Sequence, residues 1–374
     1  MKILFPSYAF YPDQGGGPSS SIYWLSKELV KSGIEVDVVV TTRGLNDFFP
    51  SNRDVIVDGI NVRYCSYLLM KFPLKVIYHS LRKVRNSDIV HFSSVYFSPN
   101  FLIGLYALIL KKKIVWSPRG EFAGQLKINP IKKVYLKLFA KLFSSKVYFH
   151  GTSEKEIEEI KNTMGANVKT VLLPNYLELP DKIECPTEKE LLFMGRINPV
   201  KALDQLVDAL SLSTRFKESE YRFVIAGVPA GKGAEEYYEG LKKQVVSLAL
   251  QEKVHFIGHI KGEEKNREYA KAYFTFLVSH TENFGNVVVE SMAQGTPVVT
   301  SIGTPWKVLN EKSIGYCVSN SPQSLANVID EILSLPEDQY SRMREGAYQY
   351  CINEFSVAHN INKWIAYYNQ IEKQ

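Results

Sequence analysis

The chain has 374 residues, of which 45% are hydrophobic, 22% charged and 12% aromatic. This composition excludes an intrinsically disordered chain, and the length favours two domains over one, because domains average roughly 150 residues. The four cysteines, Cys65, Cys185, Cys317 and Cys351, are far apart and form no CxxC pair, which argues against a zinc site or a disulfide framework and indicates a reducing compartment.

The net charge of +6 is unevenly distributed. Residues 1–180 contain 24 Lys or Arg against 14 Asp or Glu, a balance of +10, so the remaining residues carry −4. A basic half predicts an anionic partner: a phosphorylated ligand, a membrane surface or a nucleic acid. The opening MKILFPSYAF is too short for the apolar region of a signal peptide, and the longest apolar run, FLIGLYALIL, is well below the roughly 20 residues that span a membrane. We therefore expect a cytoplasmic protein.

Short β-branched runs alternate with helical patterns along the first half. A helix is expected over 19–31, and strands are expected at 2–5, 35–40, 88–92, 113–117, 146–150 and 168–173. Strands separated by helices predict a parallel sheet covered by helices on both faces. We assign residues 1–180 to this first doubly wound domain.

The same pattern restarts after a polar, proline-containing stretch at 181–188, which we interpret as a linker. The second domain, 189–355, has expected strands at 191–195, 222–227, 254–258, 274–279 and 297–301. The tail, 356–374, has the apolar spacing of a helix, with Ile361, Trp364 and Tyr368 on one stripe. Ligands of such sheets bind beyond the carboxyl ends of the strands, so the loops there are the places to look for chemistry.

The stretch LLFMGRINPVKALDQLVDAL places two cations after a buried strand. The strand ends at Gly195, Arg196 follows it, and Lys201 lies where a helix is expected to begin. A guanidinium, an ammonium and the free N–H groups of a helix end suit a diphosphate. The alternative is a pair of solvated cations at a strand end.

The stretch TENFGNVVVESMAQGTPVVTS places two carboxylates around a glycine turn. Glu282 is expected in the loop after a strand, and Glu290 about one turn inside the next helix. The turn at Gly285 can bring bare backbone amides against a ligand. A carboxylate that accepts hydrogen bonds from two hydroxyls is a common protein partner of a sugar diol. Solvated surface charges are again the alternative.

The order and spacing of these motifs, together with IAG, VHFIG and GTPVV, closely resemble the retaining glycosyltransferase family 4, of the GT-B fold and the Leloir type. The resemblance covers nearly the whole C-terminal half. The N-terminal half matches more loosely through DQGGGPSS, SPRGEF, HGTSEKE and LPN. The resemblance implies two Rossmann-like doubly wound domains that face a central cleft. It also implies that residues 1–180 bind the acceptor, that residues 189–355 bind the nucleotide sugar, and that the helix at 356–374 returns to the first domain.

The resemblance also implies roles for individual residues. Arg196 and Lys201 match the pair that neutralises the donor diphosphate, and Glu282 matches the acid near the reacting carbon of the sugar. Glu290 matches the acid that holds the ribose hydroxyls. The remaining implied donor-binding residues lie in glycine-containing loops: Phe284, Gly285, Asn286, Gly227, Gly15, Gly16 and Gly17.

One departure from the family pattern concerns the loop at 117–121. Many members carry a histidine there, whereas this chain reads SPRGE, which resembles a branch of the family. Arg119, Glu121 and His150 are the side chains expected to contact the sugar or the acceptor. A structural ion pair between Arg119 and Glu121 is the alternative.

No Asp-x-Asp triplet occurs and the seven histidines are scattered, so we expect no metal and no cofactor besides the co-substrate. The expected activity is transfer of a hexose-type sugar from a UDP- or GDP-sugar to a carbohydrate or lipid-linked glycan acceptor, in bacterial surface polysaccharide synthesis. Whether Glu282 is a nucleophile or positions the donor stays open. Two alternatives are an epimerase-like enzyme of the same architecture and a basic nucleic-acid-binding protein; no nucleic-acid motif is present, so no nucleic-acid partner is expected.

Two basic, apolar stretches, 67–85 and 127–146, suit contact with anionic lipid. In the second, Lys133, Lys137 and Lys141 follow helical steps beside Val134 and Leu138. The alternative is a helix that faces the core and exposes only its lysines. Lipid contact would place the protein at the inner face of the membrane, peripherally bound.

Overall fold

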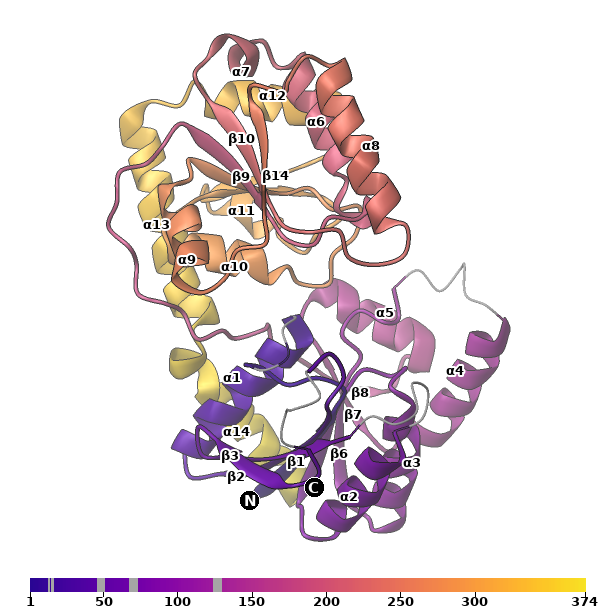
Figure 1. Cartoon of the computed structure of the whole chain (residues 1–374). Helices are drawn as coiled ribbons and strands as arrows, with labels where there is room; N and C mark the ends of the chain where they lie inside the picture. Colours follow the sequence, from indigo (N-terminus) through magenta and orange to yellow (C-terminus); the bar gives the residue numbers. More distant parts are fainter. Residues whose placement is uncertain (13, 15–16, 46–50, 67–72, 124–129) are drawn as a thin grey trace. The chain divides into compact units, whose positions relative to one another are not determined.

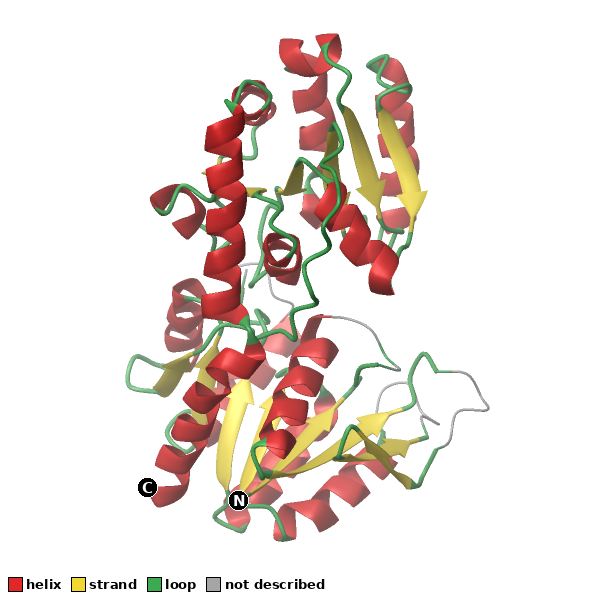
Figure 2. Cartoon of the chain, turned by 90° about the vertical axis from the view of Figure 1, so that its left-hand side faces the viewer, coloured by secondary structure: helices red, strands yellow, loops and turns green. Residues whose placement is uncertain are grey.

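The chain folds into two α/β units, drawn in Figures 1 and 2. The computed structural model describes residues 1–12, 14, 17–45, 51–66, 73–123 and 130–374. Unit 1 comprises Met1–Glu178 and Ser356–Gln374, and unit 2 comprises Leu179–Phe355. The chain thus enters unit 2 two residues before the boundary expected at 180, and residues 181–188 contain no helix or strand.

Unit 1 is built on an eight-stranded sheet in the order β3-β4-β2-β1-β5-β6-β7-β8. Its strands are β1 (Lys2–Ser7), β2 (Glu35–Thr41), β3 (Asp54–Val57), β4 (Ile60–Cys65), β5 (Ile89–Ser93), β6 (Lys113–Ser117), β7 (Tyr148–Gly151) and β8 (Lys169–Leu172). Its helices are α1 (Gly17–Lys31), α2 (Leu74–Arg85), α3 (Ser98–Ile109), α4 (Pro130–Phe143), α5 (Glu154–Met164) and α14 (Val357–Lys373).

The expectation of parallel strands alone is wrong at one edge of this sheet. β3 pairs antiparallel with β4, with Val57 opposite Ile60. Between them, Asp58 and Gly59 both have positive φ, 47° and 80°. Two residues of this kind form the tight turn that joins antiparallel strands.

Side chains of β1 alternate between the two faces of the sheet and thereby define two cores. Ile3 and Phe5 belong to a core with residues of α1 and α14, whereas Leu4 belongs to a core with residues of α2, α3, α4 and α5. The period of two residues in a strand explains this division. The unit therefore has three layers, with helices on both faces of the sheet (Figure 2).

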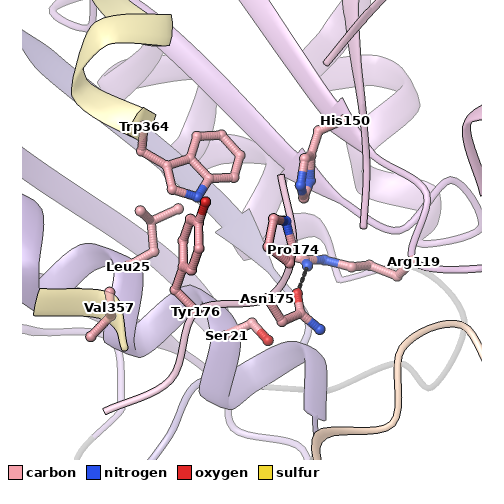
Figure 3. A pocket seen from close by; sticks show the side chains of 9 residues that line it. All are labelled: Ser21, Leu25, Arg119, His150, Pro174, Asn175, Tyr176, Val357 and Trp364. Atoms are coloured by element: carbon pink, nitrogen blue, oxygen red, sulfur yellow. Dashed lines mark hydrogen bonds between the residues drawn. The ribbon is translucent and has the colours of Figure 1, made fainter. Parts of the chain in front are cut away.

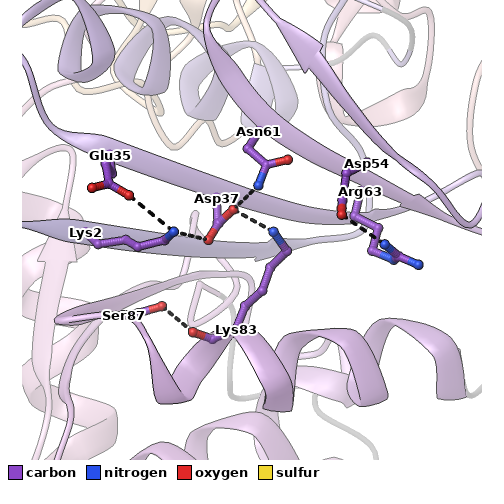
Figure 4. Close-up of polar contacts among 8 residues, drawn as sticks. All are labelled: Lys2, Glu35, Asp37, Asp54, Asn61, Arg63, Lys83 and Ser87. Carbon is purple, nitrogen blue, oxygen red and sulfur yellow. Dashed lines mark hydrogen bonds and ion pairs between the residues drawn. The ribbon is translucent and has the colours of Figure 1, made fainter.

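A buried carboxylate of β2 contacts side chains of three other elements of this unit (Figure 4). Asp37 of β2 lies 2.6 Å from the Nζ of Lys83 in α2 and 3.1 Å from the Nζ of Lys2 in β1. Asn61 of β4 donates a third contact of 2.6 Å. Because a buried charge is costly without partners, these contacts fix the relative positions of the elements that carry them.

Unit 2 is built on a six-stranded sheet in the order β11-β10-β9-β12-β13-β14. Its strands, all parallel, are β9 (Glu190–Met194), β10 (Arg222–Ala226), β11 (Val254–Gly258), β12 (Phe274–Leu277), β13 (Val298–Ser301) and β14 (Gly315–Val318). Its helices are η2 (Pro199–Lys201), α6 (Leu203–Leu212), α7 (Thr214–Glu218), α8 (Ala234–Ser247), α9 (Gly262–Lys271), α10 (Asn286–Ala293), α11 (Val308–Glu311), α12 (Pro322–Ile332) and α13 (Glu337–Phe355).

The order of these strands is that of a doubly wound dinucleotide-binding sheet. β9 is entirely buried, with Leu191 and Phe193 in one core and Leu192 and Met194 in another. Two α/β units, with sheets that are parallel except for β3, confirm the predicted fold class.

Candidate active site

The strand order of unit 2 reverses between β9 and β12. These strands are neighbours in the sheet although β10 and β11 separate them in the chain. The loops that follow them start at the same edge and turn to opposite faces, which opens the crevice where ligands bind in open α/β sheets. This edge is therefore the place to examine the residues predicted from the sequence.

The loop after β9 carries an exposed cation. Arg196 is exposed and forms no hydrogen bond or ion pair within the part of the chain that the structure describes. The backbone around it is held closely: a Cβ at Gly227 would lie 1.8 Å from the carbonyl oxygen of Gly195. Gly227 thus has a packing reason to be glycine, and its predicted contact with the donor stays a prediction.

Lys201 and Glu282, predicted as catalytic residues 81 positions apart, lie in direct contact. The Nζ of Lys201 is 2.6 Å from Oε2 of Glu282. Both side chains are largely buried, with 15% and 21% of their surface exposed. The N–H of His280 donates to the carbonyl of Val200 over 2.9 Å and ties the two loops together.

The turn at Gly285 is fixed by packing on both sides. Its φ is 85°, and a Cβ there would lie 2.6 Å from Leu277. The ring of Phe284 is buried 5.3 Å from that of Trp306, whose Nε1 donates to the carbonyl oxygen of Phe284. α10 begins at Asn286, so the N-terminus of a helix starts directly after this turn.

Glu290 is held by two side chains that were not predicted from the sequence. Lys265 of α9 lies 2.7 Å from Oε1, and the hydroxyl of Tyr269 donates to Oε2 over 3.1 Å. Burial, together with the charge of Glu290, raises the pKa of Tyr269 well above its usual value, so the phenol remains a donor. The four-residue spacing of Lys265 and Tyr269 on one helix face was the available signal.

The glycine-rich loop of unit 1 is described only at its ends. Gly15 and Gly16 lie outside the described residues, and Gly17 is the first residue of α1. The side-chain amide of Gln14 donates to the carbonyls of Thr41 and Arg43 over 3.0 and 2.6 Å.

Arg119 and Glu121, at the end of β6, make separate contacts. Nη1 of Arg119 donates to Oδ1 of Asn175 over 2.8 Å (Figure 3). Glu121 accepts from the hydroxyl of Ser94 over 2.6 Å and from the N–H of Tyr96 over 3.2 Å. The alternative of an ion pair between Arg119 and Glu121 is not found among the described residues.

His150 is fully buried in a chain of hydrogen bonds. Its Nε2 donates to the carbonyl of Leu173 over 2.8 Å, and its Nδ1 accepts from the hydroxyl of Ser117 over 2.7 Å. Ser117 in turn accepts from Nε2 of His91, whose Nδ1 accepts from the hydroxyl of Tyr368. The carbonyl of Leu173 can only accept, so Nε2 of His150 carries the proton and Nδ1 accepts. Each remaining hydrogen bond in the series then has only one possible direction.

His91 and His150, the two histidines in this series of hydrogen bonds, are both neutral. Burial, and then a nearby guanidinium, lowers the pKa of His150 to about 3. Burial lowers the pKa of His91 well below its usual value. Both ring nitrogens of His150 already have partners within the protein. Its contact with a sugar or acceptor therefore stays a prediction.

The described residues contain no group of three or more His, Cys, Asp or Glu side chains placed to hold a metal ion.

Comparisons with known proteins cover both units. Residues 178–350 match the family described as glycosyl transferases group 1, and residues 15–179 match glycosyltransferase family 4. The chain is 32% identical over 367 residues to an uncharacterized glycosyltransferase of Methanocaldococcus jannaschii, with 89% of each chain covered. It is 30% identical over 187 residues to the D-inositol 3-phosphate glycosyltransferase of Mycolicibacterium gilvum, where the match covers 50% of this chain and only 40% of the relative's length.

Among solved structures, the fold is similar to that of Anabaena HepE in complex with UDP-glucose. The TM-score is 0.77 at 18% sequence identity, and 99% of each chain is covered.

Proposed function

Since the chain belongs to glycosyltransferase family 4 and has the GT-B fold, we propose that it is a sugar-transferring enzyme with a nucleotide-sugar donor. In this proposal it moves a hexose-type sugar from a UDP- or GDP-sugar to a carbohydrate or lipid-linked glycan acceptor. The contact between Lys201 and Glu282, with the exposed Arg196 in the segment that joins β9 to Lys201, carries the proposal. It groups two cations and one carboxylate at the edge where such sheets bind nucleotides. That HepE holds UDP-glucose supports a nucleotide-sugar donor. Bacterial surface polysaccharide is the proposed product class.

The proposed step breaks the bond between the anomeric carbon and the β-phosphate oxygen and forms a bond from that carbon to an acceptor hydroxyl oxygen. The acceptor's proton passes to the departing phosphate, so the nucleoside diphosphate leaves with the charge that Arg196 and Lys201 stabilise. Fixed charges of this kind usually contribute more to rate acceleration than any other single effect. In the proposal these cations replace a metal ion.

Retention of the anomeric configuration requires attack from the face of the leaving group or a covalent intermediate. Glu282 is the carboxylate in question, and its contact with Lys201 favours a positioning role. A sugar trapped on Glu282 and detected by mass spectrometry of the digested protein would show that it is the nucleophile instead. The configuration of the product, measured by NMR of the anomeric proton, tests retention itself.

A panel of UDP- and GDP-sugars tests the donor class. We expect release of the nucleoside diphosphate with one donor, accelerated by an acceptor glycan. An epimerase-like enzyme would instead release a modified free sugar without an acceptor. Calorimetry that detects no association with any donor or nucleoside diphosphate would overturn the proposal.

We further propose that α4 docks on anionic lipid. One face of α4 is buried, as expected for a helix that packs against the core; its buried residues are Leu136, Phe139 and Phe143. The outward face, however, exposes Ile131, Val134 and Leu138 by 77%, 68% and 47% among its lysines.

Apolar side chains between cations suit the interface of an anionic leaflet. The other stretch proposed from the sequence is described only from residue 73 onward, where α2 exposes Leu74 and Tyr78. None of the helices in the described ranges is both long and apolar enough to cross a membrane.

A further inference from the structure

A small pocket of unit 1 contains an unusual distribution of charge (Figure 3). Arg119 and Asn175 line it on one side, and Ser21 of α1 and Trp364 of α14 line it from the helices. Within the described part of the chain, Arg119 is its only charged lining residue, and no carboxylate lines it. His150, also at the wall, is neutral at physiological pH.

Among the described residues, the guanidinium of Arg119 has one acceptor, the side-chain oxygen of Asn175. Its Nε is buried without a hydrogen-bond partner, and no acceptor among the described residues pairs with Nη2. Burial lowers the pKa of Arg119, and the charge of Glu156 offsets this only in part. Arg119 as a whole is half-buried, but proteins seldom leave a buried N–H donor such as its Nε without an acceptor.

Neither Glu156 nor Glu121 compensates this charge by direct contact. Glu156, whose charge acts on Arg119, accepts from the N–H of Gly120 over 2.7 Å and from the N–H of Thr152 over 2.8 Å. Glu121 accepts from Ser94 and from backbone N–H groups. Both carboxylates therefore fix loop backbone and lie outside ion-pair distance of the guanidinium.

We infer that this pocket is a subsite for an anionic oxygen group, a phosphate or a carboxylate, carried by the acceptor. A guanidinium with free donors matches the planar geometry of such groups, and Ser21 and Asn175 supply neutral polar contacts beside it. The inference rests on the proposed function, because the two phosphates of a hexose-type donor are already assigned to Arg196 and Lys201. A further anion then belongs to the other substrate.

Inorganic phosphate and acetate are the probes for this subsite. The Nε–H resonance of Arg119, assigned by its loss in Arg119→Lys, is followed by NMR during titration of the full chain with each anion. We expect a saturable shift. In Arg119→Gln, phosphate binding at the pocket, followed through the indole N–H of Trp364, should weaken roughly tenfold to a hundredfold, the usual effect of losing a charge-assisted hydrogen bond.

Two controls locate the response. Arg196→Ala removes the other proposed phosphate site and should leave the Arg119 shift intact. Arg85→Gln removes an exposed arginine of the same unit and should change nothing. The shift of the Arg119 resonance is measured on the unsubstituted protein, so it can be interpreted even if one of the variants misfolds. No saturable shift with either anion, or an equal response of Trp364 in Arg119→Gln, would overturn the inference.

The failure of the proposed function gives a different result. If nucleoside diphosphates do not bind while the Arg119 shift saturates, the pocket holds an anion but the transferase proposal fails. If nucleoside diphosphates bind and Arg119 does not respond, only the subsite fails. Tighter binding of phosphate than of acetate would identify the acceptor group as a phosphate, and the reverse order would identify it as a carboxylate.

Discussion

Arg196 and Lys201 differ in how the protein holds them. Lys201 is already paired with Glu282, whereas Arg196 is exposed and has no partner among the described side chains. Removing the lysine therefore leaves a carboxylate uncompensated at the site, in addition to losing a cation. Removing the arginine loses the cation alone.

We predict that Arg196→Ala lowers sugar transfer roughly 100- to 1,000-fold and that Lys201→Ala lowers it at least as much, because each removes a charge that stabilises the leaving diphosphate. Initial rates with the donor found in the panel provide the measurement. Arg342→Ala, an exposed arginine of α13, is the matched control and should retain full activity. Near wild-type rates in both site variants would refute the assignment.

The neutral histidines of unit 1 predict a dependence of stability on pH. Folded His150 has a pKa of about 3, and folded His91 is also lowered, whereas the unfolded chain has the usual 6.5. Between these values the unfolded state binds more protons, so stability is greatest above pH 6.5 and is lost as the pH falls toward 3.

From pH 6 to pH 5 each histidine should cost up to about 1.4 kcal/mol of unfolding free energy. Urea unfolding of unit 1 at these two values, followed by a probe in that unit, measures the loss. His150→Asn should reduce the slope, whereas His255→Asn, at an exposed position, should leave it unchanged. An unfolding free energy that is constant between pH 7 and pH 5 would contradict the neutral state of the two folded histidines.

Candidate site residues could be proposed from the sequence where a single motif carries them, and their roles stay predictions. Arg196, Lys201, Glu282 and Glu290 belong to such motifs. The partners of these residues come from other elements: Lys265 reaches Glu290 from α9. Sequence spacing does not report contacts between separate elements, and so these partners were missed.

At the level of elements, most strands were predictable from their apolar runs, including four-residue strands such as β12 and β13. β6 spans the predicted 113–117, and β9 and β10 lie within a residue of their predictions. β3, β4 and β14 were missed. All three have partly exposed side chains at alternate positions or throughout, so none of them has a continuous buried apolar run. The dipeptide Asp58-Gly59 was a usable hairpin signal in the sequence, because Asp-Gly suits a tight turn that needs positive φ at both residues. Both residues have positive φ in the structure.

The outward face of α4 predicts a membrane interaction that depends on individual side chains. We expect Ile131→Ser with Val134→Ser to reduce sedimentation with anionic liposomes at low salt severalfold, because about 1 kcal/mol or more of apolar transfer is lost per side chain. The pair Val246→Ser and Ile257→Ser, on unit 2, removes comparable exposed apolar surface and should have no effect. Equal loss in both pairs, or no sedimentation of the unsubstituted protein, would contradict the proposal.

At the level of the whole molecule, the last residues of the chain complete the first unit. Five side chains of α14 lie in the core that also contains β1 and α1: Val357, Ile361, Trp364, Tyr368 and Ile371. Their spacing is that of one helix face. Tyr368 also donates to the buried His91, so α14 satisfies a polar group as well as covering the sheet. Unit 1 therefore depends on a segment that follows all of unit 2 in the chain.

We predict that Trp364→Ala destabilises unit 1 by about 3–5 kcal/mol, the usual cost of removing a buried tryptophan, and leaves unit 2 unchanged. Hydrogen exchange of peptides from β1 and α1 should accelerate, while exchange in β9 and β10 should not. Lys373→Ala, at the exposed end of the same helix, is the matched control. Each unit has its own core, so a perturbation in one core reaches the other only if the two unfold together. Equal acceleration in both units would show that they unfold as one cooperative body and would contradict the division drawn here.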